Sequence, residues 1–141
     1  IKVIIIKIDE EMDYGPILIQ EKIVLSGNEF MKDLEKSLAK LGGKLLIKII
    51  PEFIADKIKA VEQDHGRATY VKKIIKADGE INLMDNPIEN WRKFRAYASW
   101  PRTFFFKNGK RIIITRARLE NNKFIIEKII PENGKETDYK N

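Results

Sequence analysis

The chain has 141 residues, of which 43% are hydrophobic and 34% are charged, and its formal net charge at pH 7 is +6. This composition predicts a folded chain with a core, and the lack of Cys excludes disulfides, thiolate nucleophiles and Cys-ligated zinc. The single His excludes a His cluster for a metal, and no apolar run approaches the roughly 20 residues of a membrane span. Because no secretory leader opens the chain, we expect a cytoplasmic protein without a membrane partner.

Charge is distributed unevenly along the chain. Residues 1–66 hold ten Lys, no Arg and twelve acidic residues, whereas residues 67–141 hold ten Lys, seven Arg and nine acidic residues. The two parts therefore carry net charges of −2 and +8, which favours two modules, the second of them suited to contact with a polyanion. The alternative is a Lys-rich protein whose surface charges are simply solvated.

The first predicted elements are two strands that flank an acidic loop. Residues 2–8 are mostly β-branched and apolar, as in a largely buried strand, and residues 17–25 form a second strand. Between them, residues 9–16 carry four carboxylates and end in Gly-Pro, which is a loop signal. Carboxylates at the end of a buried strand are a frequent place for chemistry in α/β folds, although an acidic loop is more often a solvated turn.

A long helical pattern comes next. Residues 26–29 read Ser-Gly-Asn-Glu, the pattern of a capping box at a helix start. Gly42-Gly43 and Pro51 interrupt the pattern, so it predicts either one long kinked helix or two short helices in line. The apolar positions at helical spacing are Phe30, Leu34, Leu38, Leu41, Leu45 and Ile49.

The second half of the chain predicts one helix followed by short strands. Residues 87–97 begin with Pro at the first helical position, and Trp100-Pro101 stops the helix. Strands are predicted at 103–106, 111–117 and 124–130, and Asn108-Gly109 is the preferred two-residue hairpin turn. A helix followed by such a meander is a small α+β or barrel-like module, and residues 131–141 read as a loose polar tail.

The acidic loop resembles a loop of the folate-dependent formyltransferases, in which an acidic stretch ends in Asp-x-Gly. The resemblance places the catalytic Asp of that family at Asp13. It also places Asp9, Glu10 and Glu11 in the segment whose backbone contacts the pterin end of the folate, so these four residues are the expected folate-binding residues. The formyl donor it implies is 10-formyltetrahydrofolate, and it implies no metal.

Further segments resemble one branch of this family, the methionyl-tRNA formyltransferases. The branch has Gln-Asp, Ala-Thr-Tyr, Lys, Ile-Asp-Trp, Arg-Ala and Trp-Pro in this order. The corresponding segments here are Gln63-Asp64, Ala68-Thr69-Tyr70, Lys73, Ile81-Asn82-Leu83, Arg95-Ala96 and Trp100-Pro101. The end of the chain, Phe124 to Lys135, resembles the terminal strand and Pro-x-Gly-Lys segment of that branch, with Pro131-Glu132-Asn133-Gly134-Lys135 in place of the latter.

The resemblance implies a fold in three parts. Residues 1–61 are expected to be the C-terminal part of a Rossmann-like α/β formyltransferase domain, 62–86 a linker, and 87–141 a tRNA-binding α+β or OB-like β-barrel domain. The stretch after Leu119 is shorter than the corresponding stretch of the family's barrel, so the barrel is expected to be shortened. The family pairs its Asp with an Asn-x-His motif, which does not occur in this sequence. We therefore expect an incomplete copy that is inactive alone, and whose exposed first strand pairs with a second copy.

Residues outside the acidic loop have competing interpretations. His65 is expected to be a surface residue of the linker, and Trp91, Phe94, Tyr97 and Trp100 are expected to pack in a core rather than to stack on bases. Arg116 and Arg118 lie on one face of a strand. The full set of cations expected to contact tRNA phosphates is Lys72, Lys73, Lys76, Arg92, Arg95, Arg102, Arg111, Arg116 and Arg118.

The function that the resemblance implies is transfer of a formyl group from 10-formyltetrahydrofolate to the methionine amine of initiator methionyl-tRNA, for translation initiation. The expected partners are therefore the folate co-substrate and initiator methionyl-tRNA. Two alternatives stay open: a nucleotide-sugar N-formyltransferase, which shares the Asp loop, and a non-catalytic RNA-binding remnant that keeps only the basic surface.

Overall fold

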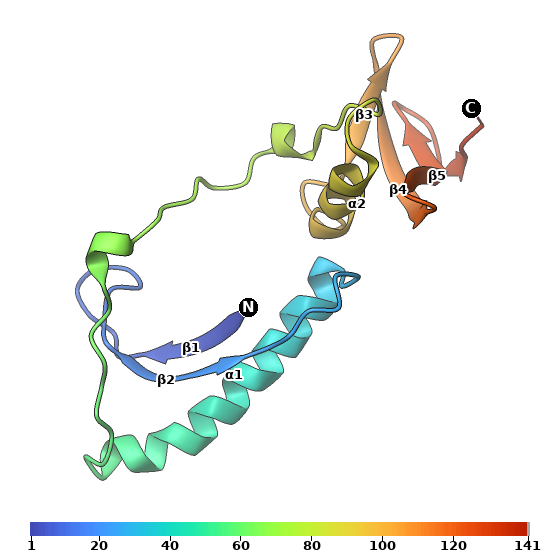
Figure 1. The fold of residues 1–141 in the computed structure, drawn as a ribbon. Coiled ribbons are helices and arrows are strands. Elements are labelled where there is room, and N and C mark those ends of the chain that lie inside the picture. Colours follow the sequence, from blue (N-terminus) through green and yellow to red (C-terminus); the bar gives the residue numbers. More distant parts are fainter. Residues whose placement is uncertain (141) are drawn as a thin grey trace. The chain divides into compact units, whose positions relative to one another are not determined.

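A computed structural model describes residues 1–140, which divide into two compact units (Figure 1). The first unit comprises Ile1–Asn28 and Asp33–Val71, and the second comprises Glu29–Lys32 and the chain from Lys72 onward. The predicted division into domains at residues 61 and 86 stays a prediction. No helix among the described residues is long and apolar enough to cross a membrane.

The first unit begins with an antiparallel hairpin of β1 (Lys2–Ile6) and β2 (Ile17–Lys22). Both strands end earlier than predicted, at Ile6 instead of residue 8 and at Lys22 instead of residue 25. Only a single bond, from the Lys7 amide to the Pro16 carbonyl at 2.9 Å, continues the ladder toward the loop. The chain beyond it turns away into the acidic loop, so the last apolar residue of the predicted strand, Ile8, is 90% exposed.

One continuous helix, α1 (Met31–Ile54), follows the hairpin and includes both Gly42-Gly43 and Pro51. A Cβ added at Gly42 would lie 3.7 Å from the Val3 side chain, an ordinary van der Waals distance, so the helix passes close to β1 at this position. Leu45 and Ile49 are the buried residues of the helix, on the predicted stripe. Of the two predicted alternatives, one long helix is the observed one.

The predicted helix start was wrong by several residues. The Ser26 hydroxyl accepts a hydrogen bond from the Asn28 amide at 3.3 Å and so forms a local turn, while α1 begins only at Met31. Phe30 does not belong to the apolar stripe of the helix. Its ring packs edge-on against Trp91 and Phe94 in the second unit, and this tertiary contact overrides the local capping signal.

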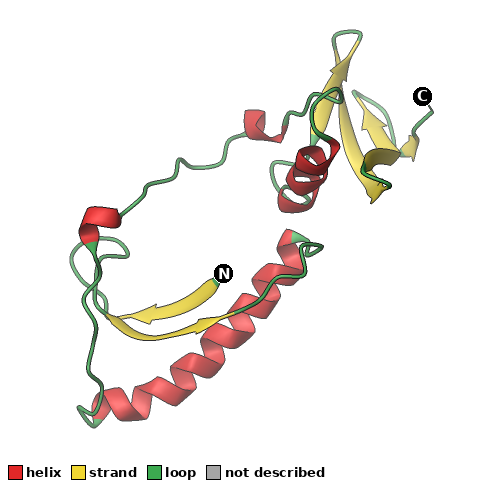
Figure 2. Cartoon of the chain, viewed as in Figure 1, coloured by secondary structure: helices red, strands yellow, loops and turns green. Residues whose placement is uncertain are grey.

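The second unit contains the predicted helix, α2 (Pro87–Ala96), which begins with Pro and whose Asn86 side chain accepts from the Ile88 amide at 2.9 Å. Four antiparallel strands follow as a meander in the order β3-β4-β5-β6 (Figure 2). Asn108 and Gly109 both have positive φ, as the predicted hairpin turn requires. The strands are β3 (Phe104–Lys107), β4 (Lys110–Glu120), β5 (Lys123–Pro131) and β6 (Thr137–Asp138).

The core of the second unit lies between α2 and this sheet. Phe94 of α2 packs with residues from all three long strands and with Ile81, which enters through a hydrogen bond from its amide to the Phe104 carbonyl at 2.9 Å. Within the described residues the sheet is open, because β3 and β6 do not pair with each other. The fold is therefore a mixed α and β arrangement without a closed barrel.

The predicted loose tail was wrong for residues 137–139. Thr137 and Asp138 pair with β5, and the Tyr139 amide donates to the Glu127 carbonyl at 2.9 Å. The Tyr139 ring then packs edge-on against Phe105. A two-residue strand has no periodicity to detect in a sequence, so only the packed partner reveals it. Asn141, the last residue of the predicted tail, lies outside the described residues.

Candidate functional site

The acidic loop brings its four predicted carboxylates to one place. Asp9, Glu10, Glu11 and Asp13 are all exposed, and together with Ile6, Ile8 and Met12 they line an open hollow of about 420 Å³. The Asp9 carboxylate accepts a hydrogen bond from the Glu10 amide at 2.6 Å, which turns the chain at the start of the loop. The hollow thus presents several hydrogen-bond acceptors to a ligand.

Asp13 occupies the tip of the loop in a left-handed backbone conformation with a φ of 59°. Asp occupies this region more often than most non-glycine residues, because its short polar side chain can form local hydrogen bonds. Two residues later, Gly15 is buried, and a Cβ at that position would lie only 1.8 Å from the Lys7 carbonyl oxygen. The close crossing of the loop's two ends therefore requires glycine, and it fixes the base from which Asp13 projects.

A second and larger hollow, of about 600 Å³, shares Asp13 with the first and is lined by Asp13, Tyr14, His65, Arg67 and Tyr70 among others. The rings of Tyr14 and His65 are stacked with their centroids 3.5 Å apart and their planes only 6° apart. His65 is therefore half-buried against the acidic loop, instead of lying on the surface of a linker as predicted. Asp13 borders both hollows.

Gln63 is a residue of this site that the sequence did not single out for a role. Its side-chain nitrogen Nε2 donates to the Asp13 carbonyl at 2.8 Å and to the Gly15 carbonyl at 2.6 Å. In the sequence, Gln63-Asp64 is only one of several segments that resemble the methionyl-tRNA formyltransferases. Since about fifty residues separate the partners, no local pattern could have indicated the contact.

Among residues 1–140, no three His, Asp or Glu side chains are grouped so that they could hold a metal ion. The chemistry that this site offers is hydrogen bonding and proton exchange by exposed carboxylates beside an imidazole.

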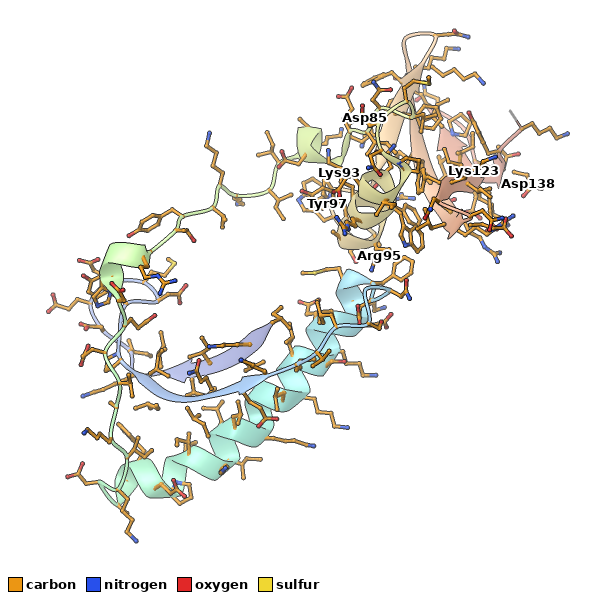
Figure 3. The ribbon with its side chains drawn as sticks, in the orientation of Figure 1. Asp85, Lys93, Arg95, Tyr97, Lys123 and Asp138 are labelled. Atoms are coloured by element: carbon orange, nitrogen blue, oxygen red, sulfur yellow. The ribbon has the colours of Figure 1, made fainter. Side chains whose placement is uncertain are left out.

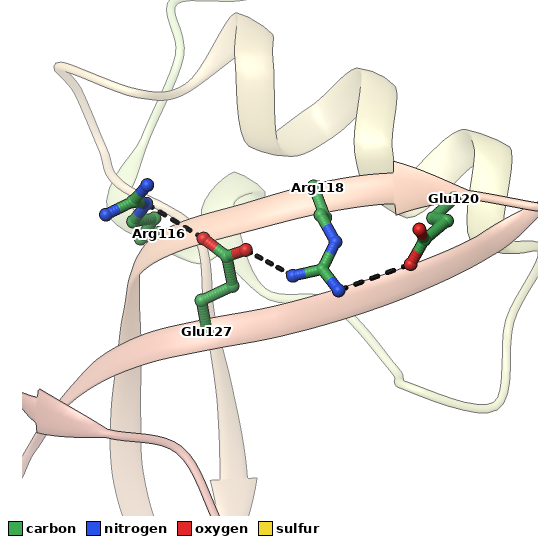
Figure 4. A network of polar contacts seen from close by, with 4 residues as sticks. All are labelled: Arg116, Arg118, Glu120 and Glu127. Carbon is green, nitrogen blue, oxygen red and sulfur yellow. Dashed lines mark hydrogen bonds and ion pairs between the residues drawn. The ribbon is translucent and has the colours of Figure 1, made fainter.

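The predicted phosphate-binding residues Arg116 and Arg118 lie on β4 and share one carboxylate across the sheet (Figure 4). Glu127 of β5 pairs with Arg116 at 2.8 Å and with Arg118, and Arg118 also pairs with Glu120 at 3.2 Å. Hydrogen bonds to Glu127 and then to Glu120 hold the pKa of the Arg118 guanidinium above its ordinary value. Two cations and two anions thus form a locally neutral network.

The other arginines of the predicted set also contact neighbours in the protein. Arg92 pairs with Glu89 at 2.5 Å on the exposed face of α2. Arg95, labelled in Figure 3, donates to the Glu29 carbonyl at 2.8 Å and lies over the Trp91 ring. The Arg111 guanidinium lies 4.0 Å from the centroid of the Phe104 ring. Half-buried Arg95 and Arg111 therefore contribute to packing as well as to charge.

The lysines of the predicted set are differently placed. Lys72, Lys73 and Lys76 are all exposed, and none of them forms an ion pair with another described residue. Arg102, which has a φ of 69°, likewise makes no ion pair within the described part of the chain. The predicted cations thus all belong to the second unit, where they are spread from Lys72 to Arg118.

Comparison with known proteins links both units to one family. Residues 73–138 match the formyl transferase C-terminal domain. The methionyl-tRNA formyltransferase of Kosmotoga olearia is 44% identical over 97 residues, which are 69% of this chain and 31% of the relative. That of Caldicellulosiruptor saccharolyticus is 37% identical over 120 residues, which are 83% of this chain and 38% of the relative. The chain thus spans about a third of the length of these curated relatives.

Solved structures share the fold. The methionyl-tRNA formyltransferase from Clostridium thermocellum matches 93% of this chain and 56% of its own, with a TM-score of 0.67 and 22% identity. An N-formyltransferase from Helicobacter canadensis, solved with folinic acid and dTDP-3-aminofucose, matches 92% of this chain and 51% of its own, with a TM-score of 0.70 and 20% identity. Together with the curated relatives and the matched domain, these similarities show that the chain belongs to the formyltransferase family.

Proposed function

We propose that this chain takes part in transferring a formyl group from 10-formyltetrahydrofolate to the methionine amine of initiator methionyl-tRNA, in the cytoplasm and for translation initiation. The observation that carries the proposal is the 37% identity over 120 residues to a methionyl-tRNA formyltransferase. That alignment is longer than either unit, so it includes both the unit with the acidic loop and the unit with the basic surface.

Asp13 is the residue to which we assign proton handling in this reaction. The amine attacks the formyl carbon to form a tetrahedral intermediate, which collapses as the bond between that carbon and N10 of the folate breaks and tetrahydrofolate leaves. The amine loses a proton and N10 gains one, and this proton transfer is a task for a carboxylate at the reacting centre. Asp13 suits that task because it is exposed at the border of two hollows on a loop whose base is held rigidly. Within the 141 residues no Asn-x-His motif occurs, so Asp13 is the member of the family's catalytic set that this chain supplies.

The folate co-substrate is assigned to the hollow lined by Asp9, Glu10, Glu11 and Asp13. A pterin ring presents amino and ring N–H donors, and carboxylates and open loop carbonyls are acceptors for them. The hollow of about 420 Å³ is large enough for a ring system of that size. The donor supplies an activated formyl carbon, and the residues of this chain orient it toward the amine.

The tRNA is assigned to the basic part of the chain, through the predicted cations. Of these, Lys72, Lys73 and Lys76 are the most available, since they are exposed and make no ion pair with a described residue. Arg116 and Arg118 contribute less because Glu127 and Glu120 already neutralise them. We retain the three-part organisation, with residues 87–141 as the tRNA-binding domain, as part of this proposal.

A sugar N-formyltransferase is the second candidate, because the structure from Helicobacter canadensis, which was solved with dTDP-3-aminofucose, has a TM-score of 0.70. The acceptor separates the two. The native protein, here the intact enzyme that carries this chain, is given radiolabelled 10-formyltetrahydrofolate and is offered either methionyl-tRNA or a dTDP-amino sugar. Label in the tRNA fraction alone supports the first function, and label in the sugar nucleotide alone overturns it in favour of the second.

A further inference from the structure

Residues 61–64 run along the acidic loop as a strap, and a single 3-10 turn begins at His65. The Ile17 amide donates to the Val61 carbonyl at 2.8 Å, and the Val61 amide donates back to Ile17 at 2.9 Å. Two residues on, the Gln63 side chain bonds to the loop, and two residues further the His65 ring stacks on Tyr14. The strap is thus attached by backbone bonds at Val61 and by side chains at Gln63 and His65.

Gln63 is the attachment nearest to Asp13. Both of its partners, the carbonyl oxygens of Asp13 and Gly15, are acceptors only, so the amide nitrogen must face them. The bond to Gly15 is partly buried, which shields it from competing water, whereas the bond to Asp13 is exposed. One NH₂ group thus uses both of its hydrogens to fix two carbonyls on either side of Tyr14.

These two bonds add to the few contacts that hold the tip of the loop. Backbone bonds tie the ends of the loop, from Lys7 to Pro16 and from Ile17 to Val61, and a long bond from the Tyr14 amide to the Glu11 carbonyl, at 3.4 Å, crosses the tip. At the tip Asp13 keeps a φ of 59°, a region that costs a non-glycine residue free energy, so the Gln63 bonds help to hold it there. Since the backbone angles set where the carboxylate points, Gln63 controls its direction without touching it.

We infer that Gln63 is a positioning residue for Asp13, acting through the backbone of residues 13–15. This inference rests on the proposed function, in which Asp13 handles the proton. In the proposed function neither co-substrate is assigned to Gln63, so we expect its loss to affect the orientation of the carboxylate and to leave both binding sites in place.

The test is Gln63→Glu in the native protein. The new side chain has nearly the same shape but replaces the NH₂ donor with a carboxylate oxygen facing two carbonyl oxygens, which repel it. We expect kcat to fall about tenfold to a hundredfold while KM for the folate and the tRNA stays within about twofold, as for a misplaced reacting group. Gln20→Glu is the matched control, because Gln20 is exposed on β2 and its side chain accepts only from Lys2.

A double-mutant cycle separates positioning from a merely structural role. If Gln63 acts through the Asp13 carboxylate, Gln63→Glu has no further effect on kcat once Asp13 is Asn, because there is no carboxylate left to orient. Additive losses in the double variant would overturn the inference, as would a Gln63→Glu kcat within threefold of wild type beside an impaired Asp13→Asn. An Asp13→Asn variant with wild-type turnover would instead overturn the role of Asp13 in the proposed function.

Amide hydrogen exchange provides a readout that does not depend on turnover. In Gln63→Glu we expect faster exchange confined to residues 11–16, where the Tyr14 amide donates to the Glu11 carbonyl, with α1 unchanged. Gln63→Ala, which removes the donor without adding charge, should show the same local change. Unchanged exchange of the loop in both variants would contradict the inference, whatever their activity.

Discussion

At the scale of single residues, the loop depends on two positions with opposite requirements. Asp13 adopts a positive φ that its short polar side chain tolerates, whereas Gly15 is required by space, since the Lys7 carbonyl oxygen occupies the position of a Cβ. The first position carries the proposed chemistry and the second makes the loop crossing possible. A substitution at Asp13 should therefore mainly lower turnover, whereas a substitution at Gly15 should mainly lower stability.

Gly15→Ala should destabilise the first unit. The added methyl group would lie 1.8 Å from a backbone oxygen that cannot move alone, so we expect a loss of about 2 kcal/mol or more in the free energy of unfolding. The matched control is Gly43→Ala on α1, where a Cβ meets nothing within 4 Å. There alanine's better helix propensity should stabilise by about 0.5–1 kcal/mol. Urea unfolding followed by circular dichroism measures both, and equal effects of the two substitutions would contradict this account of Gly15.

The sequence could predict part of this residue-scale picture. The acidic loop and Asp13 followed from a short motif and its resemblance to a family. The Gln63 bonds and the Tyr14–His65 stack could not be predicted, because they join residues about fifty positions apart whose types are ordinary in any loop. Such contacts depend on how the strap lies against the loop, which is a property of the folded unit.

At the scale of elements, strong local signals predicted α2 and the β3–β4 hairpin well. Pro at the first helical position and Asn-Gly at a turn act through backbone angles alone, so they hold in any context. The start of α1 and the strand β6 were mispredicted because their positions depend on packing, of Phe30 against Trp91 and of Tyr139 against Phe105. The ion pairs of Arg116 and Arg118 with Glu127 were also not predicted, since the register between β4 and β5 decides where Glu127 lies.

Changing Arg116 and Arg118 together to Gln tests whether this network contacts tRNA. Each phosphate contact that is lost should shallow the log-log slope of affinity against salt by about one unit. Because both side chains must first separate from Glu127, we expect a change of about one unit for the pair. Stability should change by at most about 1 kcal/mol, as is usual for exposed ion pairs.

A salt titration of methionyl-tRNA affinity measures this slope. The comparison variant is Lys72→Gln with Lys73→Gln, whose lysines have no ion pair with a described residue and should therefore shallow the slope by nearer two units. If both double variants have the same slope as wild type, the cations behind the net charge of +8 in residues 67–141 face solvent and do not contact tRNA.

At the scale of the whole chain, the second unit is built from two separate segments of the sequence. Glu29–Lys32 belongs to the second unit although residues on both sides of it belong to the first. Phe30 is the reason, together with the Glu29 carbonyl that accepts from Arg95 at 2.8 Å. The sequence shows that the net charge changes sign near residue 66. Nothing in its composition, however, indicates that Phe30, just ahead of α1, packs in the second unit.

Phe30→Ala should therefore destabilise the second unit and leave the first unchanged. Removing a half-buried ring that contacts Trp91 and Phe94 should cost about 1–3 kcal/mol. Both Trp residues lie in the second unit, so Trp fluorescence reports its unfolding. The control is Leu34→Ala, on α1 in the first unit. A shift of the fluorescence transition by Leu34→Ala but not by Phe30→Ala would contradict the division.

The measurement that tests the central claim most directly is formylation of methionyl-tRNA by the native protein and by its Asp13→Asn variant, at saturating 10-formyltetrahydrofolate. Asn tolerates a φ of 59° at least as well as Asp, so the fold should be kept. We predict that wild type forms formylmethionyl-tRNA, and that the variant does so with kcat lower by about a hundredfold or more and KM little changed. A variant within threefold of wild type would show that Asp13 is only a turn residue, and a wild-type protein that leaves methionyl-tRNA unformylated would contradict the proposed function itself.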